Sequence, residues 1–222
     1  MGYFYFLILK HYYGYDRFRP AQGEIIETIL SKRDVLAIMP TSAGKSICFQ
    51  VPALMLDGIT IVVSPLISLM YDQVTSLKEM GIQAILLNSA MTSIEYYQAI
   101  EQLQRGEVKL LYVAPERFEQ EGFLEMMQVI QISMVAVDEA HCISQWGQDF
   151  RPSYQNIDTF VAQLPTRPIV AAFTATATPR VRQDIKQQLK LQHPFEVVTS
   201  FDRANLYFGM EEPRDKMSRL LE

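Results

Sequence analysis

The sequence predicts an α/β domain with a mainly parallel sheet. Short apolar runs rich in β-branched residues alternate along the chain with amphipathic stretches of helical period. The 222 residues, of which 49% are hydrophobic, suffice to bury one large core. Alternation of this kind builds right-handed strand–helix–strand units, which place helices on both faces of a parallel sheet.

The expected strands are apolar runs that are too short for helices. Their β-branched content favours a strand over a buried helix. In chain order they are residues 35–39, 59–63, 84–87, 110–114, 134–137 and 169–173. Parallel sheets bind ligands at the carboxyl ends of their strands, so we expect functional residues directly after these runs.

Helical patterns lie between the strands and before the first of them. They cover residues 6–13, 23–30, 45–56, 66–80, 93–105, 123–130, 154–163 and 180–189. The first lies in an apolar, aromatic segment with no basic flank before it, and this segment is too short to span a bilayer. It therefore predicts a helix packed on the domain rather than a signal peptide, and no membrane role is expected.

Composition sets bounds on the partners and on the compartment. The net charge of −5 argues mildly against a protein that coats DNA, although local patches decide phosphate binding. Cys48 and Cys142 are far apart and form neither a metal-ligand set nor a disulfide framework, which favours a reducing cytosol. Cys142 adjoins an acidic motif, so it is either a reactive thiol or, as we favour, a small buried residue.

A candidate phosphate loop, Met-Pro-Thr-Ser-Ala-Gly-Lys-Ser, occupies residues 39–46 between a strand and a helix. This context supplies the backbone N–H groups, the helix N-terminus and the cation that a phosphate needs. We expect Lys45 to reach the β and γ phosphates and Ser46 to ligate Mg²⁺. The rest of the cradle would be Thr41, Ser42, Ala43 and Gly44. Because the full pattern has glycine in place of Met39, a turn with a surface lysine is the alternative.

The acidic run Asp138-Glu139-Ala140-His141 follows another strand. Asp138 is placed to hold Mg²⁺, usually through water, and Glu139 to orient or deprotonate an attacking water. Taken alone, an acidic pair after a strand is equally typical of a solvated loop or a helix N-terminus. In combination with the phosphate loop, it predicts binding of ATP with Mg²⁺ and hydrolysis of the nucleotide.

An aromatic and polar loop, residues 144–152, comes directly after the acidic run and includes the only tryptophan. Trp146 or Phe150 is suited to stack on an unpaired base, and Arg151 to bind a phosphate or a neighbouring motif. Because the loop is close to Glu139, nucleic-acid contact would reposition the catalytic carboxylate. The alternative is an aromatic plug beneath a lid.

These motifs resemble those of a known family. The phosphate loop, the acidic run and Thr174-Ala175-Thr176 resemble motifs I, II and III of superfamily-two helicases. Residues 13–22 and 145–152 resemble the adenine-recognition motif and the aromatic-rich loop of RecQ-type DNA helicases, and the resemblance covers nearly the whole chain.

The resemblance implies a RecA-like P-loop sandwich of three layers. Residues 1–200 would form the first, ATP-binding lobe, and residues 201–222 a linker with the start of a second lobe, beginning with a strand at 206–208. The resemblance further implies a motor that translocates 3′-to-5′ on single-stranded DNA and unwinds tailed duplexes in recombination and repair. The resemblance also implies a location in the cytoplasm, in association with a bacterial nucleoid.

The resemblance also implies roles for particular residues. Tyr15 and Arg19 would sandwich adenine and Gln22 would bond its edge, although Tyr15 and Phe18 as core aromatics are the alternative. Ser64, Pro65 and Leu66 resemble motif Ia, which touches the strand backbone, and a simple helix cap is the alternative. The further residues expected to contact DNA or couple it to hydrolysis are His141, Gln145, Trp146, Phe150, Arg151, Thr174 and Thr176.

Two departures from the family pattern concern Gln148, where histidine is usual, and Ser42-Ala43, where glycines are usual. The first puts a proton-dependent role at that position in doubt, whereas the second keeps small residues in the loop.

Two rival functions remain open. One is an ATP-regulated module that holds a nucleic-acid strand without unwinding it. The other is a P-loop ATPase that acts on protein, which the aromatic loop disfavours.

Overall fold

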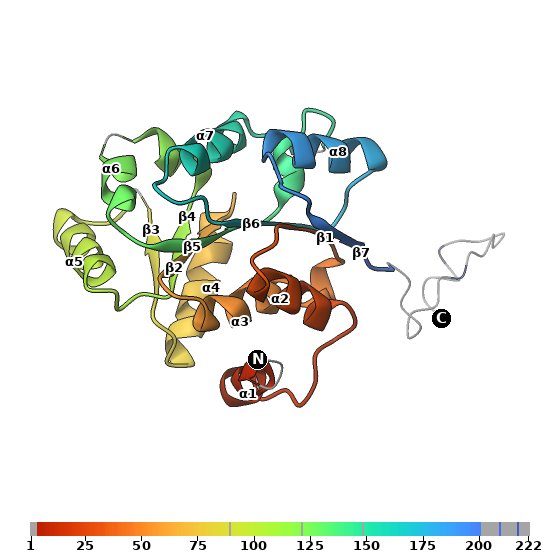
Figure 1. The fold of residues 1–222 in the computed structure, drawn as a ribbon, viewed down its shortest axis with the longest axis horizontal. Coiled ribbons are helices and arrows are strands. Elements are labelled where there is room, and N and C mark those ends of the chain that lie inside the picture. Colours follow the sequence, from red (N-terminus) through yellow and green to blue (C-terminus); the bar gives the residue numbers. More distant parts are fainter. Residues whose placement is uncertain are drawn as a thin grey trace.

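A seven-stranded parallel sheet forms the centre of the computed structural model (Figure 1). The strand order is β3-β4-β2-β5-β6-β1-β7, and every recorded pairing is parallel. The strands are β1 (Val35–Ile38), β2 (Ile59–Val63), β3 (Ala84–Leu87), β4 (Leu110–Val113), β5 (Ile132–Val137), β6 (Ile169–Thr174) and β7 (Phe195–Val198). The structure describes residues 4–88, 90–120, 122–147, 149–200, 209 and 217.

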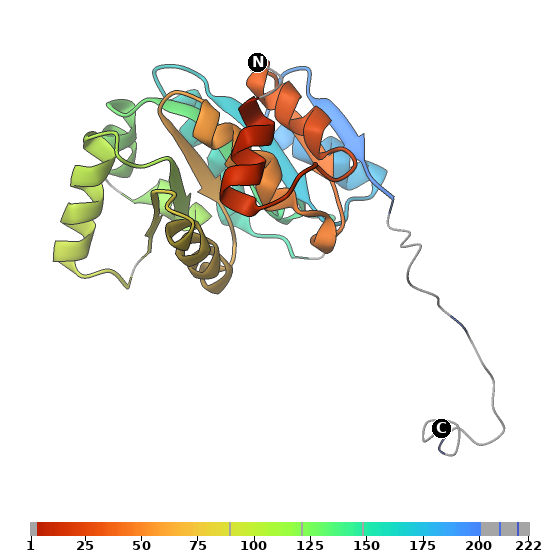
Figure 2. The same ribbon diagram turned by 90° about the horizontal axis from the view of Figure 1, so that it is seen from below.

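Helices cover both faces of this sheet, which confirms the predicted three-layer arrangement (Figures 1 and 2). One face is covered by α2 (Gln22–Leu30), α3 (Lys45–Met55) and α4 (Ile67–Glu79). The other is covered by α5 (Ser93–Gln104), α6 (Phe123–Gln128), α7 (Asn156–Ala162) and α8 (Pro179–Gln188).

The core consists of one apolar cluster on each side of the sheet. In β1, Leu36 and Ile38 join the cluster beneath α5–α8, whereas Val35 and Ala37 join the cluster beneath α2–α4. Strands that are buried on both faces need apolar residues at every position. This explains why the sequence shows continuous apolar runs instead of alternation.

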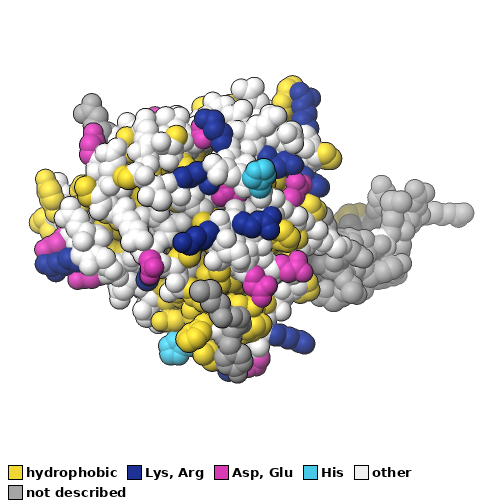
Figure 3. Space-filling model, viewed as in Figure 1, with side chains coloured by type: hydrophobic (Ala, Val, Ile, Leu, Met, Phe, Trp, Pro, Cys, Tyr) yellow, Lys and Arg dark blue, Asp and Glu magenta, His cyan; other side chains and the backbone are white. Residues whose placement is uncertain are grey.

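The N-terminal helix α1 (Phe4–Tyr13) lies outside α2 and α3 (Figures 1 and 2). Its Tyr5 packs with Ile26 of α2 and Val51 of α3 in a third apolar cluster, so the predicted packed helix is confirmed. Phe4 and Leu7 stay exposed, and Figure 3 shows a hydrophobic area where α1 lies. Within the described ranges, no helix has the length and apolar character needed to cross a bilayer.

Two elements differ from the expectation. The helix expected at 154–163 begins as a 3₁₀ turn, Pro152–Gln155, and becomes α-helical only at Asn156. Strand β7 was missed, because Phe195-Glu196-Val197-Val198 is short, contains a charge and lies half exposed at the sheet edge. Its pairing with β1, a partner distant in sequence, makes this segment a strand.

Some sequence expectations fall outside the described residues. These are the strand at 206–208 and Gln148. The division of the chain into residues 1–200 and 201–222 therefore stays a prediction.

Candidate functional site

The strand order brings the predicted motifs to one edge of the sheet. β1, β6, β5 and β2 are neighbours, and their carboxyl ends carry the phosphate loop, Thr174, Asp138 and Ser64. In register, Ile38 pairs with Thr174 and Val63 pairs with Val137. Segments far apart in sequence thus meet along the edge where parallel sheets bind ligands.

The phosphate loop is a 3₁₀ turn, Thr41–Ala43, followed by Gly44 and the start of α3. Gly44 has a φ of 79°, in the left-handed region that favours glycine. A Cβ atom at this position would lie 2.6 Å from Gln22 Nε2, so a larger residue would displace the Gln22 side chain. The turn leads directly into the N-terminus of α3, where free N–H groups can bind an anion.

Lys45 is buried at the mouth of this loop, with 7% of its surface exposed. Its Nζ atom donates to the Met39 carbonyl oxygen over 3.4 Å, which is a weak hydrogen bond. No carboxylate of the described residues lies within ion-pair distance of it. Its charge lowers the pKa of the nearby Asp138 and Glu139 but forms a close ion pair with neither, so this buried ammonium group is suited to receive an anion from a ligand. The alternative of a surface lysine is excluded.

Gln22 fastens the phosphate loop from the side. Its Nε2 atom donates to the carbonyl oxygens of Ala43 and Gly44, both over 3.1 Å, and its Oε1 atom accepts from the Arg19 N–H over 2.8 Å. Only 2% of Gln22 is exposed. Backbone groups thus form hydrogen bonds with both the nitrogen and the oxygen of the Gln22 amide. To bind the edge of a base, Gln22 would have to break at least one of these hydrogen bonds.

A cavity of about 280 Å³ adjoins the loop. It brings together the residues expected to hold adenine, with Arg17 in addition; its lining is Tyr15, Arg17, Arg19, Gln22, Thr41, Gly44 and Ile47. Tyr15 is 52% exposed and is therefore not a core aromatic, whereas Phe18 packs against Tyr5 and Phe6 at ring distances of 5.5 and 5.1 Å.

Asp138 lies at the end of β5 and is only 5% exposed. Its carboxylate accepts from the Glu139 N–H over 3.0 Å, and Tyr154 donates to its carbonyl oxygen over 2.9 Å. Burial and the adjacent Glu139 raise the pKa of Asp138 to about 6. Glu139 itself has a φ of 47°, an uncommon conformation for a residue other than glycine. Such left-handed residues cluster at functional sites.

His141 links the acidic run to the end of β6. Its Nδ1 atom lies 2.8 Å from Thr174 Oγ1 and 3.3 Å from Glu139 Oε2. The Cys142 sulfur and the Glu139 carboxylate raise the pKa of His141 to about 10, while the hydrogen bond with His141 lowers the pKa of Glu139. Thr174 in turn donates to the Thr176 carbonyl oxygen over 3.1 Å. His141 thus bridges the end of β6 and the glutamate.

The aromatic loop lies beside these residues. Trp146 is 58% exposed, Gln145 is exposed and Phe150 is partly buried. A Cβ atom at Gly147 would lie 2.5 Å from the His141 carbonyl oxygen, so the close approach of the two segments requires glycine. The exposed tryptophan argues against the alternative of a buried plug.

Arg151 ties the loop to the segment that follows β2. It donates to the Pro65 carbonyl oxygen over 2.8 Å, so it contacts a neighbouring motif rather than projecting into solvent. Ser64 is buried, and its hydroxyl has no hydrogen-bond partner among the described residues. The exposed part of this segment is Leu66. Contact with a strand would therefore involve Pro65 and Leu66 more readily than the Ser64 side chain.

Residues 19–185 match the sequence model of the DEAD/DEAH box helicase family. The chain belongs to this family. Its DEAH sequence is Asp138-Glu139-Ala140-His141.

Relatives of this helicase domain confirm the resemblance to RecQ helicases. The chain is 49% identical over 210 residues to the ATP-dependent DNA helicase RecQ of Bacillus subtilis, covering 94% of this chain and 36% of the relative. It is 44% identical over 213 residues to the RecQ of Haemophilus influenzae, covering 96% and 34%. The chain thus spans about a third of the length of these relatives.

A solved structure supports the fold of the helicase domain. A hypothetical ATP-dependent RNA helicase from Sulfolobus tokodaii superposes with a TM-score of 0.67 at 20% identity, covering 88% of this chain and 56% of that one. At this identity the likeness concerns the fold alone.

Several residues of the helicase site were missed by sequence reasoning. Tyr154 supports Asp138, Arg17 lines the cavity beside Tyr15, and Arg180 lies over the Trp146 ring. Arg17 lies within the motif at residues 13–22 but had been given no role, whereas the contacts of Tyr154 and Arg180 join residues distant in sequence. The buried Cys142 agrees with the favoured alternative of a small core residue.

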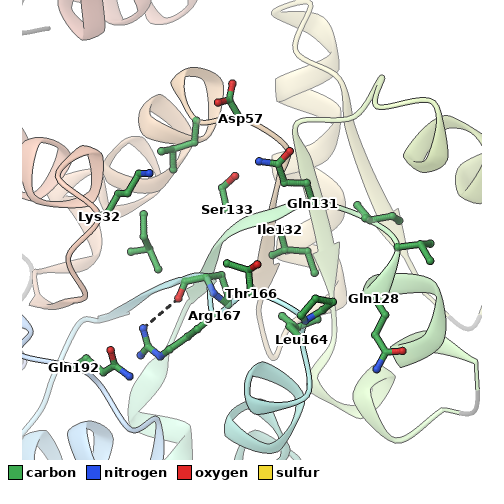
Figure 4. A pocket seen from close by; sticks show the side chains of 16 residues that line it. Lys32, Asp57, Gln128, Gln131, Ile132, Ser133, Leu164, Thr166, Arg167 and Gln192 are labelled. Atoms are coloured by element: carbon green, nitrogen blue, oxygen red, sulfur yellow. Dashed lines mark hydrogen bonds between the residues drawn. The ribbon is translucent and has the colours of Figure 1, made fainter.

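A second cavity, of about 640 Å³, lies at the opposite edge of the sheet (Figure 4). It lies beside the amino ends of β5 and β6, and Gln131, Ser133 and Thr166 are among its lining residues. Below it, Arg167 pairs with the buried Asp34 over 2.6 Å. Asp34 directly precedes β1 and also accepts from the Val170 N–H, so the pair joins the start of β6 to the start of β1. This cavity contains none of the helicase motifs.

Proposed function

We propose that the chain is the first motor lobe of a RecQ-type, ATP-dependent DNA helicase that moves 3′-to-5′ on single-stranded DNA. The observation that carries the proposal is the connection of Glu139, through His141, to both Thr174 and the aromatic loop. A motor must transmit nucleic-acid contact to the group that activates water, and this connection provides a route.

The nucleotide end of the site fits ATP. Lys45 presents a buried cation at a helix N-terminus, and the cavity beside it carries Tyr15 and Arg19, whose aromatic and guanidinium planes suit a base. We assign phosphate binding to residues 41–46 and to the charge of Lys45. Such clamps act mainly on charge that develops in the transition state.

The residues also fit Mg²⁺. The Ser46 hydroxyl and the Asp138 carboxylate supply hard oxygen ligands, which this ion prefers. The described residues contain no cluster of three or more acidic, histidine or cysteine side chains that would hold a metal unaided. This agrees with an ion held by few protein groups, by water and by substrate phosphates. Mg²⁺ would neutralise phosphate charge, while Glu139 orients the attacking water and accepts its proton.

DNA would lie along the carboxyl edge, over the aromatic loop and the segment after β2. The Arg151–Pro65 hydrogen bond joins these two surfaces, so contact at one is transmitted to the other. The net charge is −5, and Figure 3 shows basic and acidic side chains interspersed on the visible face. We therefore expect local contacts and base stacking, rather than a broad basic field, to hold the strand.

Without a second lobe, the chain should act as an ATP-regulated module that binds a nucleic-acid strand but does not unwind a duplex. In two-lobed motors an arginine of the second lobe stabilises the transferring phosphate, and such arginines contribute roughly 10³–10⁵ in rate. Translocation also requires grips on DNA that move relative to one another. A second lobe is thus a partner that the proposal requires.

The deciding experiment combines ATP hydrolysis with strand displacement on a 3′-tailed duplex. We expect the chain alone to hydrolyse ATP slowly, with stimulation by single-stranded DNA, and to leave the duplex intact. The chain joined to a second lobe should unwind it. Hydrolysis that is indifferent to DNA but stimulated by a protein would favour the rival ATPase. Robust unwinding by the chain alone would contradict the need for a second lobe in the same polypeptide.

A further inference from the structure

The exposed Trp146 carries a guanidinium group on its ring. The Cζ atom of Arg180 lies 3.2 Å from the ring centroid. Arg180 belongs to the first turn of α8 and is itself exposed, and Trp146 retains 58% of its exposure despite this contact. A guanidinium over an indole face is attracted by the ring quadrupole and stacks on it.

The same helix holds the backbone of the loop. Ser144 donates to Asp184 Oδ2 over 2.7 Å, and its Oγ atom accepts from the Trp146 N–H over 3.2 Å. Asp184 lies four residues after Arg180, so both project from neighbouring positions of α8. α8 therefore restrains the tryptophan at its backbone and at its ring.

We propose that Arg180 is a positioning residue for single-stranded DNA, which holds the Trp146 ring so that the opposite face accepts an unpaired base. The proposal rests on the DNA-binding role of the aromatic loop given above and adds the residue that sets the ring orientation. One face is occupied by Arg180, and the exposure that remains leaves room for a base on the other. The bound arrangement is a stack of base, indole and guanidinium.

Preorganisation is the physical advantage of this arrangement. An exposed tryptophan without a partner samples several rotamers and loses that freedom when a base stacks on it. Arg180 confines the ring before DNA arrives, so less ordering remains to oppose binding.

The position of α8 gives the restraint a further consequence. The helix begins at Pro179, three residues after Thr176, and the Thr178 side chain caps it by accepting from the Val181 N–H. The His141–Thr174 contact joins the preceding strand to the acidic run. The Trp146 ring, although it belongs to a loop, is therefore held in place by a helix that follows the strand contacted by His141.

The test uses Trp146 as its own reporter, because the chain contains a single tryptophan. The variants are Arg180→Ala, Arg180→Gln, Arg180→Lys and Trp146→Ala. Lys186→Ala is the matched control: it removes the same charge from the same helix, but Lys186 pairs with Glu196 over 2.9 Å instead of contacting the loop. Quenching of tryptophan emission by acrylamide and its anisotropy are measured without DNA. Affinity is then measured at low salt with a fluorescein-labelled oligothymidylate.

We expect Arg180→Ala and Arg180→Gln to increase quenching, to lower the tryptophan anisotropy and to raise the Kd for the oligonucleotide about two- to tenfold, the cost of ordering one such side chain. Arg180→Lys should fall between these variants and the unaltered chain, because lysine keeps the charge without the planar group. Lys186→Ala should leave the tryptophan emission unchanged.

The outcomes separate this inference from the proposed function. If Trp146→Ala weakens DNA binding but Arg180→Ala does not, the role of Arg180 is overturned and the DNA-binding role of the loop stands. If Arg180→Ala and Lys186→Ala weaken DNA binding equally, Arg180 contributes only its positive charge, and the positioning role is overturned. If Trp146→Ala leaves DNA binding unchanged, the DNA-binding role of the loop is overturned, and the inference with it.

Discussion

The Nδ1 atom of His141 lies 2.8 Å from the Thr174 hydroxyl oxygen, although the two residues belong to different strand ends. The same nitrogen lies 3.3 Å from Glu139. Because β5 and β6 are neighbours in the sheet, a movement at the end of β6 reaches the glutamate through one histidine. This bridge joins Thr174 to the residue proposed to activate water.

Thr174→Val tests this bridge. Valine matches the shape of the buried threonine but removes the hydroxyl. We expect basal ATP hydrolysis to remain and its stimulation by single-stranded DNA to fall several-fold, because His141 loses one of its anchors. Thr28→Val is the control, since the Thr28 hydroxyl donates to the Glu24 carbonyl oxygen within α2. A Thr174→Val variant with normal stimulation would show that coupling takes another route.

In the chain joined to a second lobe, Lys45→Ala should abolish most ATP hydrolysis. Removing one group that stabilises transition-state charge lowers a rate roughly 10²–10³-fold. The measurement is phosphate release at saturating ATP, together with the affinity for a fluorescent ATP analogue. Lys32→Ala, at the opposite edge of the sheet, is the control and should hydrolyse normally. Near-normal turnover by Lys45→Ala would contradict the phosphate-loop assignment.

Asp138→Asn and Glu139→Gln should separate metal binding from water activation. Glu139→Gln should bind ATP with Mg²⁺ but hydrolyse it slowly, because the amide cannot accept a proton. Asp138→Asn should raise the Mg²⁺ concentration needed for half-maximal nucleotide binding. For both variants, nucleotide binding and ATP hydrolysis are measured while Mg²⁺ is titrated at a fixed nucleotide concentration. If each variant lost only nucleotide affinity, and to the same extent, the separate roles would be wrong.

Trp146→Ala and Phe150→Ala should spare basal hydrolysis and reduce its stimulation by single-stranded DNA. Stacking on an aromatic side chain contributes about 1–3 kcal/mol per base, so the DNA concentration for half-maximal stimulation should rise roughly tenfold. Tyr97→Ala, an exposed aromatic on α5, serves as the control. Parallel loss of basal and stimulated rates would indicate that the loop only maintains the structure.

Gln22→Ala should destabilise the phosphate loop. The substitution removes the hydrogen bonds of Gln22 with the Ala43 and Gly44 carbonyls and with the Arg19 N–H, and unmade bonds of this type cost about 1–3 kcal/mol. We expect a lower free energy of unfolding in urea and a weaker affinity for nucleotide. Gln98→Ala, on the exposed face of α5, should change neither. Loss of nucleotide affinity at unchanged stability would instead favour direct contact of Gln22 with the base.

Much of the fold was predictable because its signals are local. The strand at residues 59–63 was predicted with the bounds that the structure shows, since a buried parallel strand must be apolar throughout. The phosphate loop was predictable because its glycine, its lysine and the helix that follows are adjacent in sequence. The acidic run was predictable for the same reason, since Asp138 directly follows its strand.

The sequence by itself determined the α/β class, the motif residues and their place at the strand ends, because hydrophobic period and short-range motif chemistry are encoded within a few residues. Only the tertiary structure decided that Gln22 turns inward to the phosphate loop, that Arg151 binds the Pro65 carbonyl and that Arg180 covers Trp146. It also decided that Phe195–Val198 is a strand. These features depend on partners brought close by the strand order, and a sequence pattern carries no distance between residues so far apart.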